Sequence, residues 1–192
     1  PQRVAIVGGG YIAIELAAVL QALGSRVEMF VRGKQLLGGF DRELVNDLSE
    51  NLRQHGINVH FDYQLASVQA AGDKQVRLVH ESGLPTESFD GLIFATGRSP
   101  NSASLGLQAL EVALDAKGHV VVDEVQTTAL ANVHAVGDVT ARPALTPVAI
   151  AAARRLMDRL FGGDAQARLD YDNIATVVFS HPPLGMVGLG EE

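Results

Sequence analysis

Residues 3–15 read Arg3-Val4-Ala5-Ile6-Val7-Gly8-Gly9-Gly10-Tyr11-Ile12-Ala13-Ile14-Glu15, and this stretch decides the fold because it joins an apolar strand to a helix through three glycines. A dinucleotide pyrophosphate requires such a turn. Gly8 allows the tight bend, Gly10 lets the backbone approach the phosphates, and Ala13 is small enough for the helix to pack on the strand. The helix N-terminus offers N–H groups and a positive dipole end to the anion. The stretch therefore predicts a dinucleotide-binding turn.

A glycine triplet can also be an ordinary strand-to-helix turn, so the next strand, residues 26–31, is informative. It ends about 20 residues after Gly10, where such folds place the residue that reads the ribose. An NAD site usually has Asp or Glu there, but this chain has Val31 followed by Arg32. The missing acid and the guanidinium favour a 2′-phosphate, which Arg can bind through a bidentate fork. The alternative is that Arg32 is merely a solvated residue after a strand.

The composition excludes several classes of function. The chain has 192 residues, 47% of them apolar, which is enough for a sizeable core in one or two domains. Its net charge of −7 argues against a nucleic-acid or anionic-membrane surface. No run approaches the ~20 apolar residues of a membrane span, and we expect no signal peptide among the first residues given. It contains no cysteine, which excludes a disulfide scaffold, a thiolate metal site and a redox dithiol within these residues.

The periodicity predicts an α/β fold: a Rossmann-like domain with a parallel sheet and an inserted β-meander. Helices are expected at residues 11–23, 42–54 and 147–161, the second with Asp41 as its N-cap. Strands are expected at residues 3–7, 26–31, 57–61, 65–70, 75–80, 91–95, 120–122, 134–136 and from 174 onward. In the first two helices we expect one apolar face each, formed by Ile12, Leu16, Val19, Leu20 and Leu23, and by Leu44, Val45, Leu48 and Leu52.

Four segments in fixed order carry a family likeness: residues 8–15, 95–101 (Ala-Thr-Gly-Arg-Ser-Pro-Asn), 135–138 (Ala-Val-Gly-Asp) and 179–183 (Phe-Ser-His-Pro-Pro). Over its whole length the chain resembles the flavin-dependent pyridine nucleotide–disulfide oxidoreductases. Within that family, residues 145–152 and 176–183 resemble glutathione reductases most closely.

The resemblance implies a division into domains. Residues 1–96 would be the NAD(P)-binding domain, residues 97–171 the second part of the FAD-binding domain, and residues 172–192 the start of the interface or dimerisation domain. We expect the chain to be a segment of a longer polypeptide. The parts outside it would carry the N-terminal FAD fingerprint with the redox cysteine pair, and the C-terminal His–Glu pair that handles the thiol proton.

The resemblance also implies roles for individual residues. Tyr11 would cover the flavin and move aside for the nicotinamide, and Glu15 would lie near the nicotinamide, paired with a lysine outside this chain. The residues that would contact NADPH or FAD are Gly8, Gly9, Gly10, Ile12, Glu15, Arg32, Gly97, Asp138, Ala144, Thr146 and Val177. Each has a structural alternative: Tyr11 as a packed aromatic, Glu15 as a solvated acid, Gly97 as simple turn chemistry, Thr146 as an N-cap, and Ala144 and Val177 as packing residues.

The function implied is the transfer of a hydride from NADPH to FAD and on to a disulfide, with glutathione disulfide as substrate, in a cytoplasmic homodimer that binds neither nucleic acid nor membrane nor metal. The segment alone should be inactive. Two alternatives remain open: a related reductase of the dihydrolipoamide dehydrogenase or mercuric reductase type, and a non-catalytic nucleotide-binding module. One departure weakens the expected preference for NADPH. Glutathione reductases usually carry a second arginine where this chain has Gly38, although Lys34 could supply a point charge.

Overall fold

The computed structural model describes residues 1–189, which form two compact units. Unit 1 consists of Pro1–Gly97 together with the segment from Ala175 onward, and unit 2 is Arg98–Ile174. The assignment of residues 1–96, 97–171 and 172–192 to three named domains stays a prediction. What the structure adds is that the segment from Ala175 onward packs with the first 97 residues.

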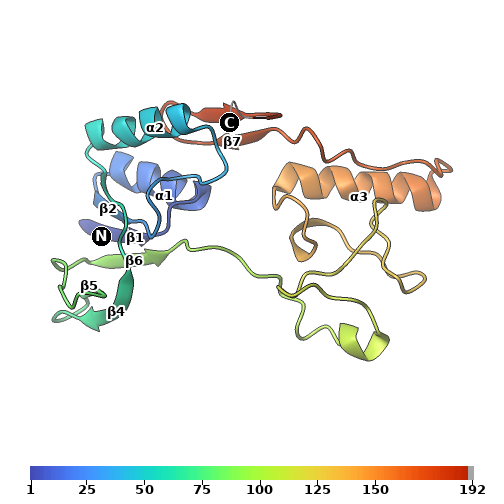
Figure 1. The fold of residues 1–192 in the computed structure, drawn as a ribbon, viewed down its shortest axis with the longest axis horizontal. Helices are drawn as coiled ribbons and strands as arrows, with labels where there is room; N and C mark the ends of the chain where they lie inside the picture. Colours follow the sequence, from blue (N-terminus) through green and yellow to red (C-terminus); the bar gives the residue numbers. More distant parts are fainter. Residues whose placement is uncertain (190–192) are drawn as a thin grey trace. The chain divides into compact units, whose positions relative to one another are not determined.

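A four-stranded parallel sheet forms the centre of unit 1 (Figure 1). Its strands lie in the order β3–β2–β1–β6, with the bounds β1 Arg3–Val7, β2 Arg26–Phe30, β3 Asn58–His60 and β6 Gly91–Phe94. In register, Ile6 of β1 lies between Met29 of β2 and Ile93 of β6. The predicted parallel sheet is therefore confirmed, and the carboxyl ends of its strands share one edge.

The sheet is covered on both faces, as all-parallel sheets require. On one face Val4 and Ile6 pack with the helices α1 (Tyr11–Ala22) and α2 (Arg42–Gln54). On the other, Ala5 and Val7 pack against the antiparallel hairpin β4 (Leu65–Ala70) and β5 (Val76–His80), together with the loop that follows it. The hairpin is inserted between β3 and β6, which confirms the predicted meander (Figure 1).

The buried face of α1 differs from the predicted one. The residues that pack on the sheet are Ala13, Ile14, Ala17 and Ala18, whereas Leu16, Val19 and Leu23 are 37%, 52% and 77% exposed. Because α1 is apolar almost all round, its periodicity does not single out one face. The small alanines form most of the buried face because they let the helix lie close to the strands.

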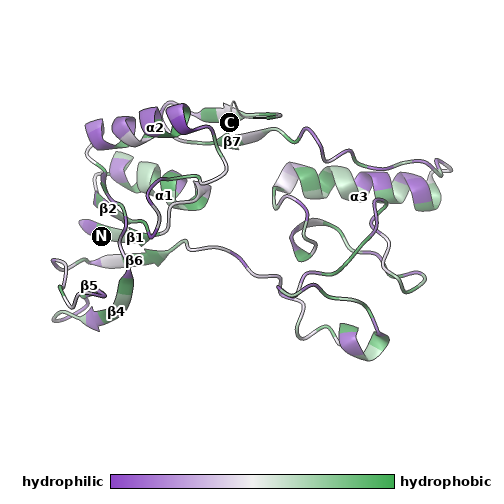
Figure 2. Ribbon diagram, in the orientation of Figure 1, coloured by the Kyte–Doolittle hydropathy of each residue, from purple (hydrophilic) through white to green (hydrophobic). Residues whose placement is uncertain are grey.

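The sequence predicts the buried face of α2 more accurately, because the polar and apolar residues of this helix lie on opposite faces. Asp41 caps it, and its carboxylate accepts the N–H of Leu44 at 3.1 Å, as predicted. The buried face contains Val45, Leu48 and Leu52, while the outer surface is hydrophilic (Figure 2). Leu44 was expected on the buried face but is 44% exposed.

The segment from Ala175 onward adds a second hairpin to unit 1, β7 (Thr176–Val178) with β8 (Leu184–Met186). Val178 is fully buried and belongs to the same core as Ile14 of α1. The final hairpin is therefore part of the hydrophobic core of unit 1.

Unit 2 contains one long helix, α3 (Thr146–Phe161), which packs through Val148, Ala152 and Leu156. The short strands predicted at residues 120–122 and 134–136 are wrong, because the structure has only isolated bridges there. Aspartate side chains organise this part of the chain instead. Asp115 accepts two main-chain N–H groups, and Asp123 does the same. Such local bonds compete with strand ladders.

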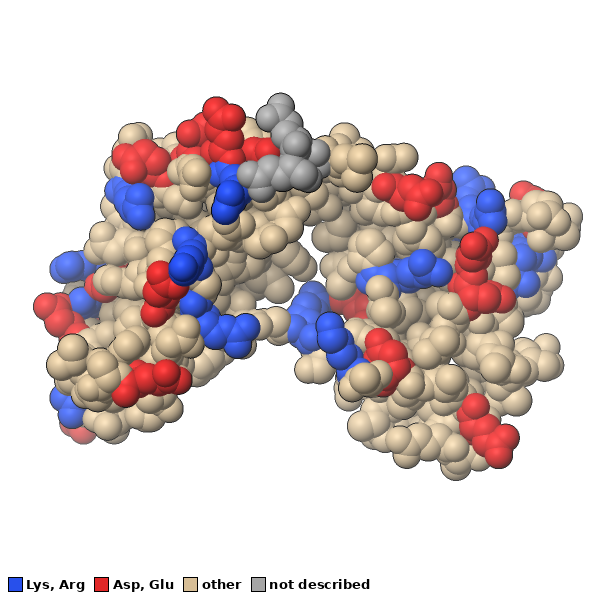
Figure 3. All heavy atoms as spheres, viewed as in Figure 1, with Lys and Arg blue, Asp and Glu red and all other residues tan. Residues whose placement is uncertain are grey.

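The surface carries charges of both signs. Figure 3 shows basic and acidic side chains interspersed over the face in view, consistent with a net charge of −7. None of the helices within residues 1–189 is long and apolar enough to cross a membrane.

A buried carboxylate lies beneath the sheet on the hairpin side. Glu28 of β2 is 7% exposed, and its two oxygens contact Arg3 Nη2 at 2.7 Å and His60 Nε2 at 3.0 Å. Burial alone would raise the pKa of Glu28. The hydrogen bonds from Arg3 and His60 outweigh that effect and hold the pKa below its usual value of 4.5.

Glu28→Gln should lower the free energy of unfolding by about 1–3 kcal/mol at pH 7, because it removes the charge that Arg3 and His60 face. The folded chain binds fewer protons at Glu28 than the unfolded chain, so this stability is present above pH 4.5 and is lost as the pH falls through the lower folded pKa. Urea unfolding at pH 7 and at about pH 3 tests both points. Glu50→Gln, on the exposed surface of α2, should change stability by less than about 0.5 kcal/mol. An equal loss for Glu28→Gln at both pH values would contradict the prediction.

Candidate functional site

The turn between β1 and α1 fits only glycine at two of its three positions. Gly8 has φ +137°, and a Cβ there would lie 2.3 Å from the carbonyl oxygen of Ala95. A Cβ at Gly9 would lie 2.7 Å from Cγ1 of Val31. The turn is thus pressed against the chain that leaves β6 on one side and β2 on the other.

The third glycine faces open space. Gly10 is the N-cap of α1, with φ −86°, and no heavy atom of residues 1–189 comes within 4 Å of a Cβ placed there. In the described part of the chain no side chain caps the first turn of α1, so its N–H groups remain for another acceptor. Ala13, one turn on, is fully buried against the sheet. Helix N–H groups, a positive dipole end and room where a side chain would stand fit a pyrophosphate.

The loop after β2 is tied to the glycine turn. Leu37 donates its N–H to the carbonyl oxygen of Gly9 at 2.9 Å, and Gly33 accepts the N–H of Asp62 at 3.0 Å. Val31 is buried, whereas Arg32 and Lys34, next to it in this loop, are exposed. The loop therefore holds two cations close to the turn.

Glu15 has a partner within this chain. Its Oε1 accepts the main-chain N–H of Phe179 at 3.0 Å, which joins α1 to the end of β7. The residue is partly buried. Tyr11, four residues earlier, is partly buried and packs against the core of unit 1, and Val177 on β7 is 44% exposed. Sequence reasoning expected only a lysine elsewhere as partner, and missed the Phe179 N–H because a main-chain group leaves no sequence signal.

The chain leaving β6 reaches the same edge of the sheet. Gly97 has φ +137°, a conformation that favours glycine, and within the described residues no heavy atom comes within 4 Å of a Cβ placed there. Gly97 lies two residues after Ala95, whose carbonyl oxygen lies against Gly8. Unit 1 thus brings together the predicted residues Gly8, Gly9, Gly10, Tyr11, Ile12, Glu15, Arg32, Gly97 and Val177.

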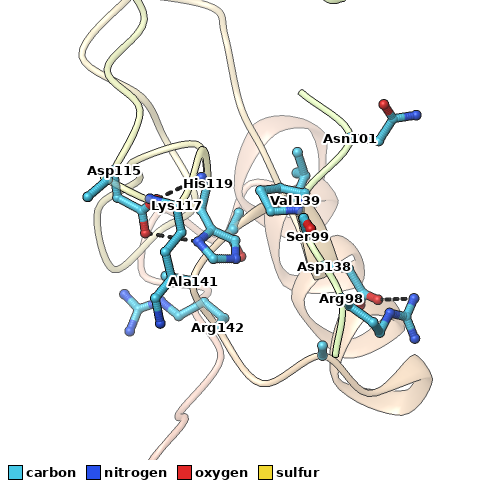
Figure 4. Close-up of a pocket in the computed structure, with 14 residues that line it drawn as sticks. Arg98, Ser99, Asn101, Asp115, Lys117, His119, Asp138, Val139, Ala141 and Arg142 are labelled. Carbon is cyan, nitrogen blue, oxygen red and sulfur yellow. Dashed lines mark hydrogen bonds and ion pairs between the residues drawn. The ribbon is translucent and has the colours of Figure 1, made fainter. Parts of the chain in front are cut away.

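Unit 2 contains the other predicted residues, two of them at a pocket of about 660 Å³ (Figure 4). Asp138 and Ala144 line it, and Asp138 Oδ2 is 2.6 Å from Nη2 of Arg98, which lies at the same pocket wall. Thr146 is the first residue of α3, but Leu145 is the N-cap and Thr146 makes no capping bond. The capping alternative for Thr146 is therefore wrong.

The opposite wall of this pocket contains a second charged group. Asp115 accepts the N–H of His119 and contacts its ring Nδ1 at 2.9 Å, and Lys117 and Arg142 lie beside them (Figure 4). The main-chain and ring hydrogen bonds from His119 hold the pKa of Asp115 below its usual range. The pocket is thus lined by two aspartates, each paired with a basic side chain. Across residues 1–189 no cluster of three or more His, Asp or Glu side chains is arranged to hold a metal ion.

The parallel sheet, the glycine turn and the open helix N-terminus define an α/β protein with the strand–turn–helix arrangement of dinucleotide-binding folds. Comparison with known families gives the same class, because the family model described as "Pyridine nucleotide-disulphide oxidoreductase" matches residues 1–153. The chain belongs to this family.

Relatives in the family cover the whole chain. It is 41% identical to glutathione reductase of Schizosaccharomyces pombe over 193 aligned residues, which include 100% of this chain and 41% of that protein. The Cu(II) complex of the HOCl-induced flavoprotein disulfide reductase RclA from Escherichia coli superposes with a TM-score of 0.92 at 30% identity, over 100% of this chain and 43% of that chain. LpdA from Mycobacterium tuberculosis shares the fold, with a TM-score of 0.89 at 24% identity over 98% of this chain and 40% of that one. The chain thus spans less than half the length of these relatives.

Gly8→Ala and Gly10→Ala should differ sharply in stability. The first places a methyl group against the Ala95 carbonyl in a left-handed conformation and should cost at least about 3 kcal/mol. The second enters open space at an ordinary φ and should cost less than about 1 kcal/mol. Thermal or urea unfolding of the two variants measures the difference. Equal losses would mean that the turn is not pressed against β6.

Proposed function

We propose that this chain is the NADPH- and FAD-contacting part of a flavoprotein disulfide reductase, with glutathione disulfide as the substrate of the whole protein. The proposal that this chain contacts NADPH rests on one observation. The loop that contains Arg32 is attached to the glycine turn by the hydrogen bond from Leu37 to Gly9. This attachment supports the proposal because the loop held at the turn carries Arg32, and has Val31 at the position where an NAD site usually has an acid. The 41% identity to a glutathione reductase supports the choice of substrate.

In this proposal the residues of unit 1 hold the nucleotide. The N–H groups that follow Gly10 bind the pyrophosphate, and Gly9 and Ile12 line the turn. Arg32 binds the 2′-phosphate, with Lys34 as an additional point charge. Tyr11, Glu15 and Val177 surround the nicotinamide end. The open space at Gly10 is what allows the phosphates to reach the main chain.

The residues of unit 2 would hold the flavin. Asp138 accepts a hydrogen bond from the ribityl chain, and the start of α3 at Thr146 directs N–H groups and its dipole toward the electron-rich pyrimidine end of the flavin ring. Gly97, which belongs to unit 1, would instead let the main chain approach the nucleotide. Bound FAD would accept the hydride of NADPH and pass the electrons to a disulfide. The role of the protein residues is to place the two cofactors.

The residues that exchange thiols would lie outside this chain, because its 192 residues contain no cysteine. We therefore place the redox cysteine pair and the proton-handling histidine in other parts of a longer polypeptide, which forms a cytoplasmic homodimer. The segment alone should not reduce a disulfide. A reductase for another substrate shares these nucleotide contacts, and a thiol search in the complete polypeptide separates it from a non-catalytic module.

Calorimetric titration of this chain with NADPH and NADH tests the proposal. NADPH should bind at least about tenfold more tightly, equivalent to ~1.4 kcal/mol. Equal binding would reopen the NAD-linked relatives, and no binding of either nucleotide would favour a module without this function. Arg32→Glu should abolish the preference, because it replaces a phosphate-binding cation by an anion. Arg26→Glu, at the other end of β2, is the matched control and should leave the preference unchanged.

Gly38→Arg should increase the preference for NADPH. Elsewhere in residues 1–189 no heavy atom approaches within 4 Å of a Cβ at this position, and the backbone is not left-handed, so the side chain can be accommodated. A second guanidinium near Arg32 should strengthen NADPH binding about three- to tenfold relative to NADH, as one additional charge-assisted hydrogen bond would. The same titrations measure it, and Gly38→Ala separates the effect of charge from that of loop stiffening. A gain for both nucleotides alike would place the phosphate elsewhere.

A further inference from the structure

The peptide group between Gly9 and Gly10 lies immediately before α1 and can rotate more easily than most. Turning its plane changes only ψ of Gly9 and φ of Gly10, and glycine tolerates wide ranges of both angles. A Cβ at Gly10 would meet no heavy atom of residues 1–189 within 4 Å, so packing on that side does not oppose the rotation. The orientation of this peptide group therefore depends on its hydrogen bonds.

One hydrogen bond holds the peptide group in place. The carbonyl oxygen of Gly9 accepts the N–H of Leu37 at 2.9 Å, and no other donor within residues 1–189 bonds to it. The peptide is trans, so the N–H of Gly10 points opposite to the Gly9 carbonyl and away from the loop that contains Leu37. Among the described residues this N–H has no acceptor. The bond from Leu37 thus leaves the Gly10 N–H for a ligand.

Leu37 has an unusual backbone conformation where it makes this bond. Its φ of +46° lies in the left-handed region, which leucine rarely adopts. The side chain is 6% exposed and belongs to the core that contains Ile14, and the carbonyl oxygen accepts the N–H of Phe40 at 2.9 Å. A strained backbone persists only where its surroundings hold it. Here the buried side chain and the bond from Phe40 keep the Leu37 N–H directed at Gly9.

We propose that Leu37 is a positioning residue that locks the Gly9–Gly10 peptide in the orientation that presents the Gly10 N–H to the pyrophosphate. This inference rests on the proposed function. If the peptide rotated, the Gly9 carbonyl oxygen would face the phosphates with its partial negative charge in place of a donor. Loss of the lock should therefore weaken the binding of nucleotides that carry a pyrophosphate.

The part of the loop that contains Arg32 is held by bonds that do not involve Leu37. Val31 and Gly33, on either side of Arg32, accept the N–H groups of Tyr63 and Asp62, both at 3.0 Å. These bonds should survive a change at position 37. A ligand that has the 2′-phosphate but no pyrophosphate should therefore bind equally well with or without the lock.

Two substitutions of Leu37 separate its conformation from its burial. Valine is β-branched and fits a left-handed backbone poorly, whereas methionine is unbranched and close to leucine in volume. In calorimetric titrations of the full 192-residue chain, Leu37→Val should weaken NADPH and NADH alike by about fivefold, the loss of one hydrogen bond. Adenosine 2′-monophosphate, titrated by NMR, should change by less than about twofold. Leu37→Met should bind all three ligands as the unmodified chain does.

Amide hydrogen exchange makes the test independent of how well Leu37→Val folds. In the unmodified chain without nucleotide, the Leu37 amide should exchange slowly and the Gly10 amide rapidly, because only the first has an acceptor. NADPH and NADH should each protect the Gly10 amide from exchange. Adenosine 2′-monophosphate should leave it unprotected.

The outcomes separate this inference from the proposed function. If Leu37→Val weakens all three ligands equally, or none, or if Leu37→Met is as weak as Leu37→Val, the positioning role is wrong while the nucleotide site stands. A rapidly exchanging Leu37 amide, or a Gly10 amide that NADPH does not protect, also overturns the inference. If the unmodified chain binds neither NADPH nor NADH, the proposed function fails and the inference fails with it.

Discussion

The close contact between the glycine turn and the chain leaving β6 is the constraint on which unit 1 depends. Gly8 lies against the carbonyl of Ala95, and Gly9 lies against Val31 at the end of β2. The two strands that flank β1 thus end against Gly8 and Gly9 of the same turn. A side chain at Gly8 or Gly9 would force the carboxyl edge of the sheet apart, and the helix N-terminus would no longer face the open space beside Gly10.

The same edge gathers other parts of the chain by main-chain bonds. Leu37 binds the Gly9 carbonyl, and Phe179 binds Glu15 one turn into α1. On the hairpin side of the sheet, by contrast, the polar interactions of Glu28 are made by side chains. Glu28 is buried and relies on side-chain partners, so its contribution depends on pH. The bond from Leu37 to Gly9 joins two main-chain groups, neither of which titrates, and this suits a turn that must keep its shape.

The sequence predicted what local patterns encode. The strand–glycine–helix succession, the Asp41 cap and the apolar run of β6 all depend on residues near one another in the chain, and the parallel sheet follows from them. The buried face of α1 was predicted wrongly, since large apolar residues surround that helix and only the sheet selects the alanines. The residues near Val120 and His134 formed no strands, because pairing requires partners that local propensity does not supply.

The candidate site divides in the same way. The glycines and Arg32 were recognisable because their residue types and spacing follow from phosphate chemistry. Leu37 and Phe179 were not, because they act through main-chain N–H groups that every residue but proline has. The pairing of Arg98 with Asp138 was predictable only in part. Both residues belong to motifs recognised in the sequence, but only the folded chain brings their side chains within 2.6 Å of each other.

The burial of Val178 among the residues of the first core has a consequence for synthesis. Unit 2 is in effect one long loop inserted into unit 1, so the earlier core remains uncapped on the ribosome until β7 emerges. Closing so long a loop is not thermodynamically prohibitive, because each doubling of its length adds only about 0.6 kcal/mol. It does delay completion, and the apolar surface around Ile14 and Ala17 stays exposed to chaperones or to neighbouring chains while residues 98–174 are being made.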